Sequence, residues 1–198
     1  KLEQIDENFF ELELAKKTIK LDVPNQIGFF ILQWAKLRML SFYYDFMDRF
    51  IDRSHFQMIE MDTDSAYFTL SKPTIEQAIR PNMMDEYKRV KDDWFPRSDT
   101  RENELYDLRQ PGLMKQEFES TECVALCSKT YCMHNDETDQ TKVSCKGVNK
   151  SSYKNPTEMY KAVLNTKRSQ IGNITGFRSK NNTMYTYTQD RIGFSYFY

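Results

Sequence analysis

Residues 56–70 constrain the fold more than any other part of the chain. Two runs of mainly apolar residues flank the short polar sequence Asp62-Thr63-Asp64-Ser65. Aspartate and serine favour turns because their side chains hydrogen-bond to the local backbone. Apolar runs on both sides of such a turn predict a β-hairpin. We therefore expect two antiparallel strands with two carboxylates, Asp62 and Asp64, at the hairpin tip.

Two carboxylates in so small a space repel each other unless a cation neutralises them. Divalent cations that prefer oxygen ligands do this well, and phosphoryl transfer by two metal ions needs such ligands. The pattern D-x-D is weak by itself. It also occurs in nucleotide-sugar glycosyltransferases and in surface turns that bind no metal, so all three interpretations remain open at this point.

The hairpin is preceded by a long helical pattern. From residue 23 to 52, apolar residues recur at steps of three and four, which predicts one long helix with Pro24 in its first turn. A second apolar set widens the stripe, so we expect this helix to be largely buried as a scaffold. The most apolar stretch, residues 29–35, is far shorter than the roughly 18 residues of a membrane span, and no span is expected.

After the hairpin we expect a short helix near residues 83–94, a polar loop through Arg109, and three strands at residues 113–119, 123–132 and 142–148. Alternation places Lys129 and Tyr131 on one face of the second strand, and Lys142 and Lys146 on one face of the third. Asn155-Pro156-Thr157-Glu158 has the pattern of a helix start, which predicts a change to helices near residue 150.

Four cysteines lie within residues 123–145 and suggest zinc. Their spacing lacks the paired C-x-x-C arrangement of tetrahedral zinc sites, so buried reduced thiols are the favoured interpretation. Cys123 and Cys127 suit the inner face of an alternating strand.

The formal net charge of −1 hides two opposite halves. Residues 141–198 contain ten basic and two acidic residues, whereas residues 1–140 contain 18 basic and 27 acidic ones. Such a division suits a protein that holds metal ions in its first part and a phosphate backbone in its second. An ordinary solvated surface gives the same asymmetry about as often.

Several motifs in a fixed order resemble family B DNA polymerases. Met61-Asp62-Thr63-Asp64-Ser65 is similar to their motif C, Ser128-Lys129-Thr130-Tyr131 to their KxY element, and Cys145-Lys146-Gly147-Val148 to the KGV segment that follows it. A helix opened by Pro24-x-x-Ile27-Gly28 precedes them. The similarity extends over nearly the whole chain and is closest to protein-primed polymerases of Maverick or Polinton elements.

The resemblance implies an α+β fold. Residues 1–150 would be the C-terminal part of the palm, an antiparallel sheet whose motif C hairpin packs on long helices. Residues 151–198 would begin a mainly helical thumb. We expect both ends to be cut from a longer chain, because no initiator methionine is present and the chain stops in an aromatic run.

The resemblance also implies residue roles. Asp64 would bind both Mg²⁺ ions, Asp62 would be an accessory carboxylate, and Thr63 and Ser65 would hold the turn. Lys129, Tyr131 and Lys146 would contact the primer strand. The expected partners are primer–template DNA, a deoxynucleoside triphosphate and a terminal priming protein, in the nucleus or a cytoplasmic viral factory.

Two polymerase motifs are missing. Neither the motif A segment DxxSLYP nor the motif B segment KxxxNSxYG occurs in the chain, so we expect it to be inactive by itself. The alternative function is a non-catalytic nucleic-acid-binding remnant of a mobile element. A glycosyltransferase is disfavoured because the basic second half would then have no role.

Overall fold

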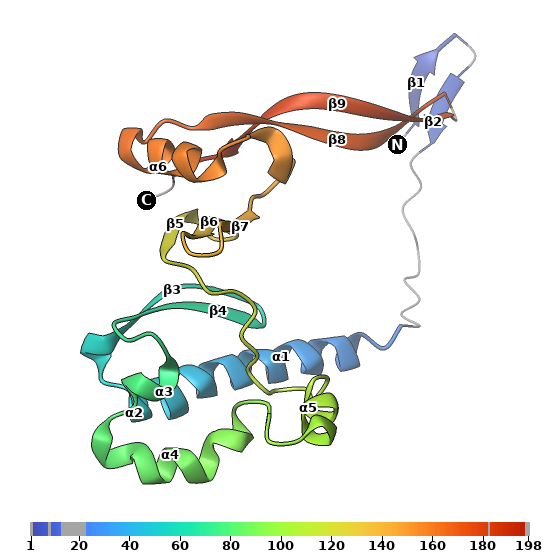
Figure 1. Cartoon of the computed structure of the whole chain (residues 1–198). Coiled ribbons are helices and arrows are strands. Elements are labelled where there is room, and N and C mark those ends of the chain that lie inside the picture. The colour runs from blue at the N-terminus through green and yellow to red at the C-terminus, as the bar shows by residue number, and fades with distance from the viewer. Residues whose placement is uncertain (1, 8, 13–22, 182, 197–198) are drawn as a thin grey trace. The chain divides into compact units, whose positions relative to one another are not determined.

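The computed structural model describes residues 2–7, 9–12, 23–181 and 183–196 (Figure 1). The chain divides into two units, Lys1–Gln33 and Trp34–Tyr198. In the first unit, strands β1 (Leu2–Asp6) and β2 (Phe9–Leu12) pair antiparallel. No helix within the described ranges is long and apolar enough to cross a bilayer. The expected α+β class is confirmed, because helices alternate with small antiparallel sheets.

The predicted long helix is confirmed, but the expectation that it is largely buried is wrong for its first half. Helix α1 (Asn25–Ser41) continues through a π-helical turn, η1 (Phe42–Met47), into α2 (Asp48–Phe50). Large apolar side chains from Ile27 to Leu37 are exposed, and Trp34 is 68% exposed. Apolar residues occur on all sides of this part of the helix. The periodicity therefore predicts a helix but does not define which side is covered.

The first core forms around the second half of this helix. Its buried side chains come from η1, α2, the hairpin and the following helices: Phe42, Phe46, Met47, Phe50, Ile51, Phe56, Ala78, Ile79 and Tyr87. The hairpin itself, β3 (Phe56–Asp62) and β4 (Ser65–Leu70), is antiparallel and confirms the prediction for this segment. The core therefore supports the strands that lead to the two carboxylates.

The connection between the hairpin and the next sheet contains more helix than expected. After α3 (Ile75–Ala78), helix α4 (Met84–Val90) and the 3₁₀ turn η4 (Lys91–Asp93) confirm the predicted helix. The segment expected to be a polar loop contains α5 (Arg101–Asp107), capped by the Thr100 hydroxyl, which accepts the Asn103 N–H at 3.1 Å.

An ion pair between Arg97 and the buried carboxylate of Asp107 links two parts of this connection. Asp107, only 3% exposed, accepts two side-chain hydrogen bonds from Arg97, each of 2.8 Å, and these bonds lower the pKa of its carboxyl to about 2. The Arg97 backbone N–H also donates to Asp107 at 2.9 Å.

The second sheet corrects two of the three strand predictions. Its order is β5 (Glu122–Cys127), β6 (Thr130–Asn135) and β7 (Gln140–Ser144), all antiparallel. Residues 113–119 form no strand, and the single strand expected at 123–132 is two strands joined by a turn at Ser128–Lys129. The inner face of β5 consists of Val124 and Leu126, and the cysteine face predicted as buried is only half-buried.

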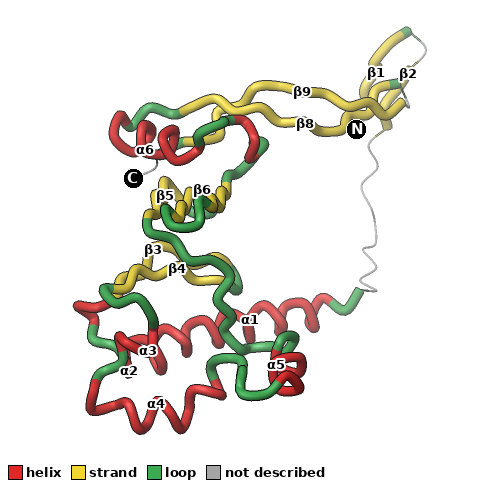
Figure 2. Tube along the Cα trace, in the orientation of Figure 1, coloured by secondary structure: helices red, strands yellow, loops and turns green. Residues whose placement is uncertain are grey.

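From residue 155 onward, the described part of the chain contains one helix and a long ribbon. Helix α6 (Pro156–Thr166) begins as predicted, with the Asn155 side chain accepting the Glu158 N–H. The expectation of a mainly helical segment is wrong, because β8 (Gln170–Lys180) and β9 (Thr183–Phe194) form an antiparallel ribbon (Figure 2). Side chains of α6, β9 and the β5–β6–β7 sheet share the second core, so this core is continuous across the predicted boundary near residue 150.

Candidate functional site

The hairpin tip holds its two carboxylates in a two-residue turn. Asp62 pairs with Ser65, so Thr63 and Asp64 alone connect the strands. The Asp64 N–H donates to the Asp62 carbonyl at 2.6 Å, and the Ser65 hydroxyl donates to the same carbonyl at 3.3 Å. Thr63 has a φ of 53°, which β-branched residues rarely adopt. Backbone strain of this kind is concentrated at functional sites.

One face of this hairpin carries the polar residues that reach the second sheet. Side chains alternate along a strand, and directly opposite residues share a face. Glu60 opposes Tyr67 and Asp62 opposes Ser65, so these four side chains lie on the same face. The pairing shifts between Met58 and Glu60, and this bulge sets which face Glu60 takes.

A second turn, between β5 and β6, meets this face. The Lys129 ammonium lies 2.5 Å from the Asp62 carboxylate, and the two groups form an ion pair. The Lys129 backbone N–H donates to the Glu60 carboxylate. The Lys129 carbonyl accepts from the Ser144 hydroxyl at 2.9 Å, so side chains of two strands, β3 and β7, meet at this residue.

Two tyrosines extend the contact away from the tip. The hydroxyls of Tyr67 and Tyr131 are hydrogen-bonded at 2.5 Å, and their ring centroids are 4.7 Å apart. Tyr131 is 7% exposed, and its burial, followed by its bond to Tyr67, raises the pKa of its hydroxyl. The Lys142 ammonium lies 5.5 Å from the centre of the Tyr67 ring, within the range of a cation–π contact.

Lysine side chains set the electrostatics of the tip. The pKa of Asp62 is lowered, chiefly by the hydrogen bond from Lys129, with smaller contributions from Thr63 and from the charge of Lys146. Lys146 is exposed in the loop after β7. We call the residues of this region the turn junction: Glu60, Asp62, Asp64, Tyr67, Lys129, Tyr131, Ser144 and Lys146.

Comparison of the chain with protein-family models, curated proteins and solved structures finds no match. The function of the turn junction is therefore argued from its own residues and from the motif pattern in the sequence.

The structure brings together most of the residues predicted as a site. Asp62, Lys129 and Lys146 interact electrostatically at the hairpin tip, and the charge of Asp64 acts on Lys129. The prediction that Lys129 and Tyr131 share one face of a strand is wrong. Lys129 lies in a turn with a φ of 63°, and Tyr131 is buried in β6.

Sequence reasoning missed three members of the junction. Alternation from Asp62 could have identified Glu60, because residues two apart share a strand face. Tyr67 could have been found as its cross-strand neighbour. Nothing local identifies Ser144, whose role depends on a hydrogen bond to a residue 15 positions earlier.

The metal-binding capacity of the tip is limited to its own two aspartates. The described part of the chain contains no group of three or more His, Cys, Asp or Glu residues that could hold a metal ion. Mg²⁺ often binds through one or two protein carboxylates and takes its other ligands from water and substrate phosphates. The donors at the tip suit such an ion only if another ligand joins them. All four cysteines are free thiols.

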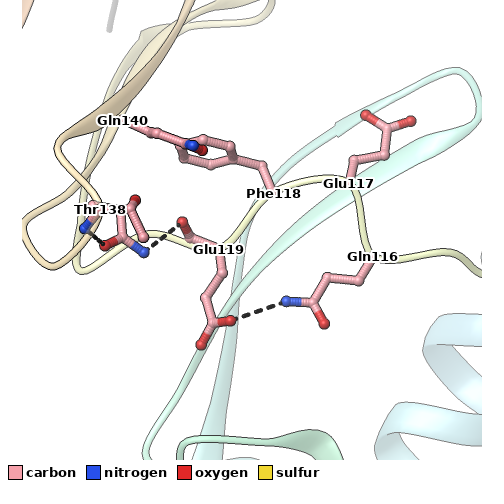
Figure 3. Close-up of a pocket in the computed structure, with 7 residues that line it drawn as sticks. Gln116, Glu117, Phe118, Glu119, Thr138 and Gln140 are labelled. Carbon is pink, nitrogen blue, oxygen red and sulfur yellow. Dashed lines mark hydrogen bonds between the residues drawn. The ribbon is translucent and has the colours of Figure 1, made fainter.

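A polar hollow of about 370 Å³ lies elsewhere on the second sheet (Figure 3). It is formed by residues 116–119 with Asn135, Thr138 and Gln140. The Gln116 amide donates to the Glu119 carboxylate at 3.1 Å across it. The hollow contains none of the turn-junction residues, so it is not the candidate site.

The ion pair at the tip gives a direct test of this geometry. In the variant Lys129→Met we expect the pKa of Asp62 to rise toward that of an ordinary aspartate, because the largest cause of its depression is removed. Carboxyl-carbon NMR titration measures this change. Lys146→Met is the matched control and should give a smaller rise, since Lys146 acts only through its charge. An unchanged Asp62 pKa in Lys129→Met would contradict the ion pair.

Proposed function

We propose that this chain is the C-terminal palm and the beginning of the thumb of a family B, protein-primed DNA polymerase. The complete enzyme would transfer a nucleotide from a deoxynucleoside triphosphate to a primer 3′-hydroxyl. One observation carries the proposal: Asp62 of the D-x-D turn forms an ion pair with Lys129 of the first downstream motif, and the charge of Lys146 of the second motif acts on the same carboxylate. A phosphoryl-transfer site needs both kinds of group, carboxylates for metal ions and cations for phosphate.

In this proposal each residue of the tip has a separate task. Asp64 and Asp62 would hold Mg²⁺ together with a motif A carboxylate from another segment. When bound, the two ions would lower the pKa of the primer hydroxyl and offset charge on the leaving pyrophosphate. Lys129 and Lys146 would bind primer phosphates. The paired tyrosines would form a packing surface, because the Tyr131 hydroxyl is already bonded to Tyr67.

The β8–β9 ribbon supports an interaction with nucleic acid. Cross-strand pairing places three cations and two tyrosines on one of its faces: Arg178, Lys180, Arg191, Tyr185 and Tyr187. The Arg178 guanidinium lies 4.1 Å from the centre of the Tyr187 ring. The one acidic residue of the two strands, Asp190, falls on the opposite face. Such a face suits a phosphate backbone.

A non-catalytic nucleic-acid-binding remnant is the second candidate. It is favoured by the small number of carboxylates at the tip, one of which is already neutralised by Lys129. This candidate shares the cationic ribbon and the lysines with the first. It differs in requiring no divalent ion for any of its properties.

A DNA-binding experiment tests the property that the two candidate functions share, an interaction of the cationic residues with nucleic acid. We expect the chain to bind a primer–template duplex, measured by fluorescence anisotropy, with an affinity that falls as salt rises. Lys129→Ala and Lys146→Ala should each weaken binding and reduce the slope of log affinity against log salt by about 1. Lys88→Ala, which removes an exposed lysine of α4, is the control and should bind normally. Unchanged DNA affinity in both Lys129→Ala and Lys146→Ala would refute the assignment of the turn junction as the DNA-binding site.

A further inference from the structure

Lys129 is held by its backbone as well as by its side chain. Its φ of 63° lies in the left-handed region, which is unfavourable for a residue other than glycine. Contacts with the surrounding residues must therefore offset this cost. The surroundings here are two side chains from other strands. Glu60 of β3 accepts the Lys129 N–H, and Ser144 of β7 donates to the Lys129 carbonyl.

Glu60 is the stronger of these two attachments. A hydrogen bond from a backbone N–H to a carboxylate is charge-assisted and roughly twice as strong as a bond between neutral groups. Glu60 also belongs to the same strand as Asp62, two residues away on the same face. One strand therefore carries both the carboxylate that pairs with the Lys129 ammonium and the carboxylate that fixes its backbone.

We propose that Glu60 is a positioning residue that fixes the β5–β6 turn against the hairpin, so that Lys129 points its ammonium at a primer phosphate beside Asp62 and Asp64. This inference rests on the proposed function. It assigns Glu60 to the backbone of Lys129 and not to the metal ions, although it is the nearest acidic residue to Asp62 along β3.

The role predicts different outcomes for two substitutions at one position. Glu60→Gln keeps an oxygen that accepts the Lys129 N–H, so the turn should stay in place. Glu60→Ala removes the acceptor and leaves the N–H without its partner. A metal-binding carboxylate would be damaged by both changes, and this difference separates the two roles.

Amide hydrogen exchange reports on the turn itself without DNA or metal. In Glu60→Ala we expect the Lys129 amide to exchange about tenfold faster or more, since loss of one such bond costs about 1.5 kcal/mol or more. In Glu60→Gln the exchange rate should stay within about threefold of that of the unchanged chain, because a neutral hydrogen bond is retained. Equal exchange in Glu60→Ala and the unchanged chain would overturn the proposal.

Primer–template affinity tests the consequence for binding. Glu60→Ala should weaken binding about as much as Lys129→Ala, and the double variant should be no weaker than Lys129→Ala alone, because both act through one ammonium. Glu60→Gln should bind nearly normally. Thermal unfolding of each variant checks that the fold is retained.

The outcomes of these experiments distinguish a failure of the Glu60 positioning role from a failure of the proposed function. If the unchanged chain fails to bind DNA, the proposed function is wrong and the positioning role falls with it. If the chain binds, Lys129→Ala weakens binding and Glu60→Ala does not, only the positioning role is wrong. Equal damage from Glu60→Gln and Glu60→Ala would also overturn it, because the carboxylate charge would then matter more than the hydrogen bond.

Discussion

Under the proposed function, Asp64→Ala is expected to abolish Mg²⁺-dependent primer extension by a polymerase that joins this chain to motif A and motif B segments. Asp64 occupies the exposed centre of the turn, and its neighbour Asp62 already has a lysine partner. Asp64 is therefore the carboxylate of the tip that is more available to a divalent ion. Stabilisation by a bound metal is worth several kcal/mol, so the rate should fall about a thousandfold or more.

The same variant should bind duplex DNA nearly as well as the unchanged protein. Removing the Asp64 carboxylate takes no cation from the tip, and Lys129 and Lys146 remain to attract phosphate. Anisotropy and single-turnover extension on the same preparation separate the two properties. Extension at the unchanged rate in Asp64→Ala would disprove the site assignment.

Two controls sharpen this result. Asp62→Asn should reduce extension less than Asp64→Ala, because Asp62 is an accessory carboxylate in the proposal. Asp85→Ala removes an exposed acid from α4, outside the turn junction, and should leave the rate unchanged. If the unchanged protein binds DNA but extends no primer at any Mg²⁺ concentration, the non-catalytic remnant becomes the better description.

The local features of this fold could be predicted from the sequence. The hairpin at residues 56–70 depends on a polar turn between two apolar runs, and the hydrogen bonds that close the turn itself join near neighbours. The start of α6 likewise depends on Asn155 and Pro156 alone. Such features need no information from distant parts of the chain.

The turn at Ser128–Lys129 could not be predicted in this way. It contains no glycine, proline or asparagine, and the left-handed conformation of Lys129 is held by Glu60, 69 residues earlier, and by Ser144. Without these partners, residues 123–132 have the composition of one strand. The same nonlocal contacts define the turn junction, so sequence motifs supplied Asp62, Lys129 and Lys146 but not the residues that hold them.

The ribbon and the exposed half of α1 were missed for other reasons. Asn181, with a φ of 52°, marks the turn between β8 and β9, and asparagine is a common residue in that conformation. The prediction of a helical segment depended instead on the helix start at Asn155 and on the resemblance to a helical thumb. For α1, periodicity predicted the helix correctly and gave no information about what lies against it.

Phe46→Ala is expected to cause a large loss of stability. Phe46 is 0% exposed, and its ring centre lies 5.1 Å from that of Phe95 and 5.3 Å from that of Phe42. Truncating a buried phenylalanine removes its transfer free energy and leaves a cavity, which together cost about 3–5 kcal/mol. Urea unfolding followed by circular dichroism measures this loss.

Phe177→Ala is the matched control, because Phe177 lies on β8 and is 73% exposed. The free energy of unfolding of Phe177→Ala should differ from that of the unchanged chain by at most about 0.5 kcal/mol.

The comparison of the two variants also tests how the hairpin is held, since Phe56 at the start of β3 belongs to the same core as Phe46. If the core supports the tip, amides of β3 and β4 should lose protection from hydrogen exchange in Phe46→Ala in proportion to the loss of stability. A Phe46→Ala chain that unfolds at the same urea concentration as Phe177→Ala would show that this core does not carry the hairpin.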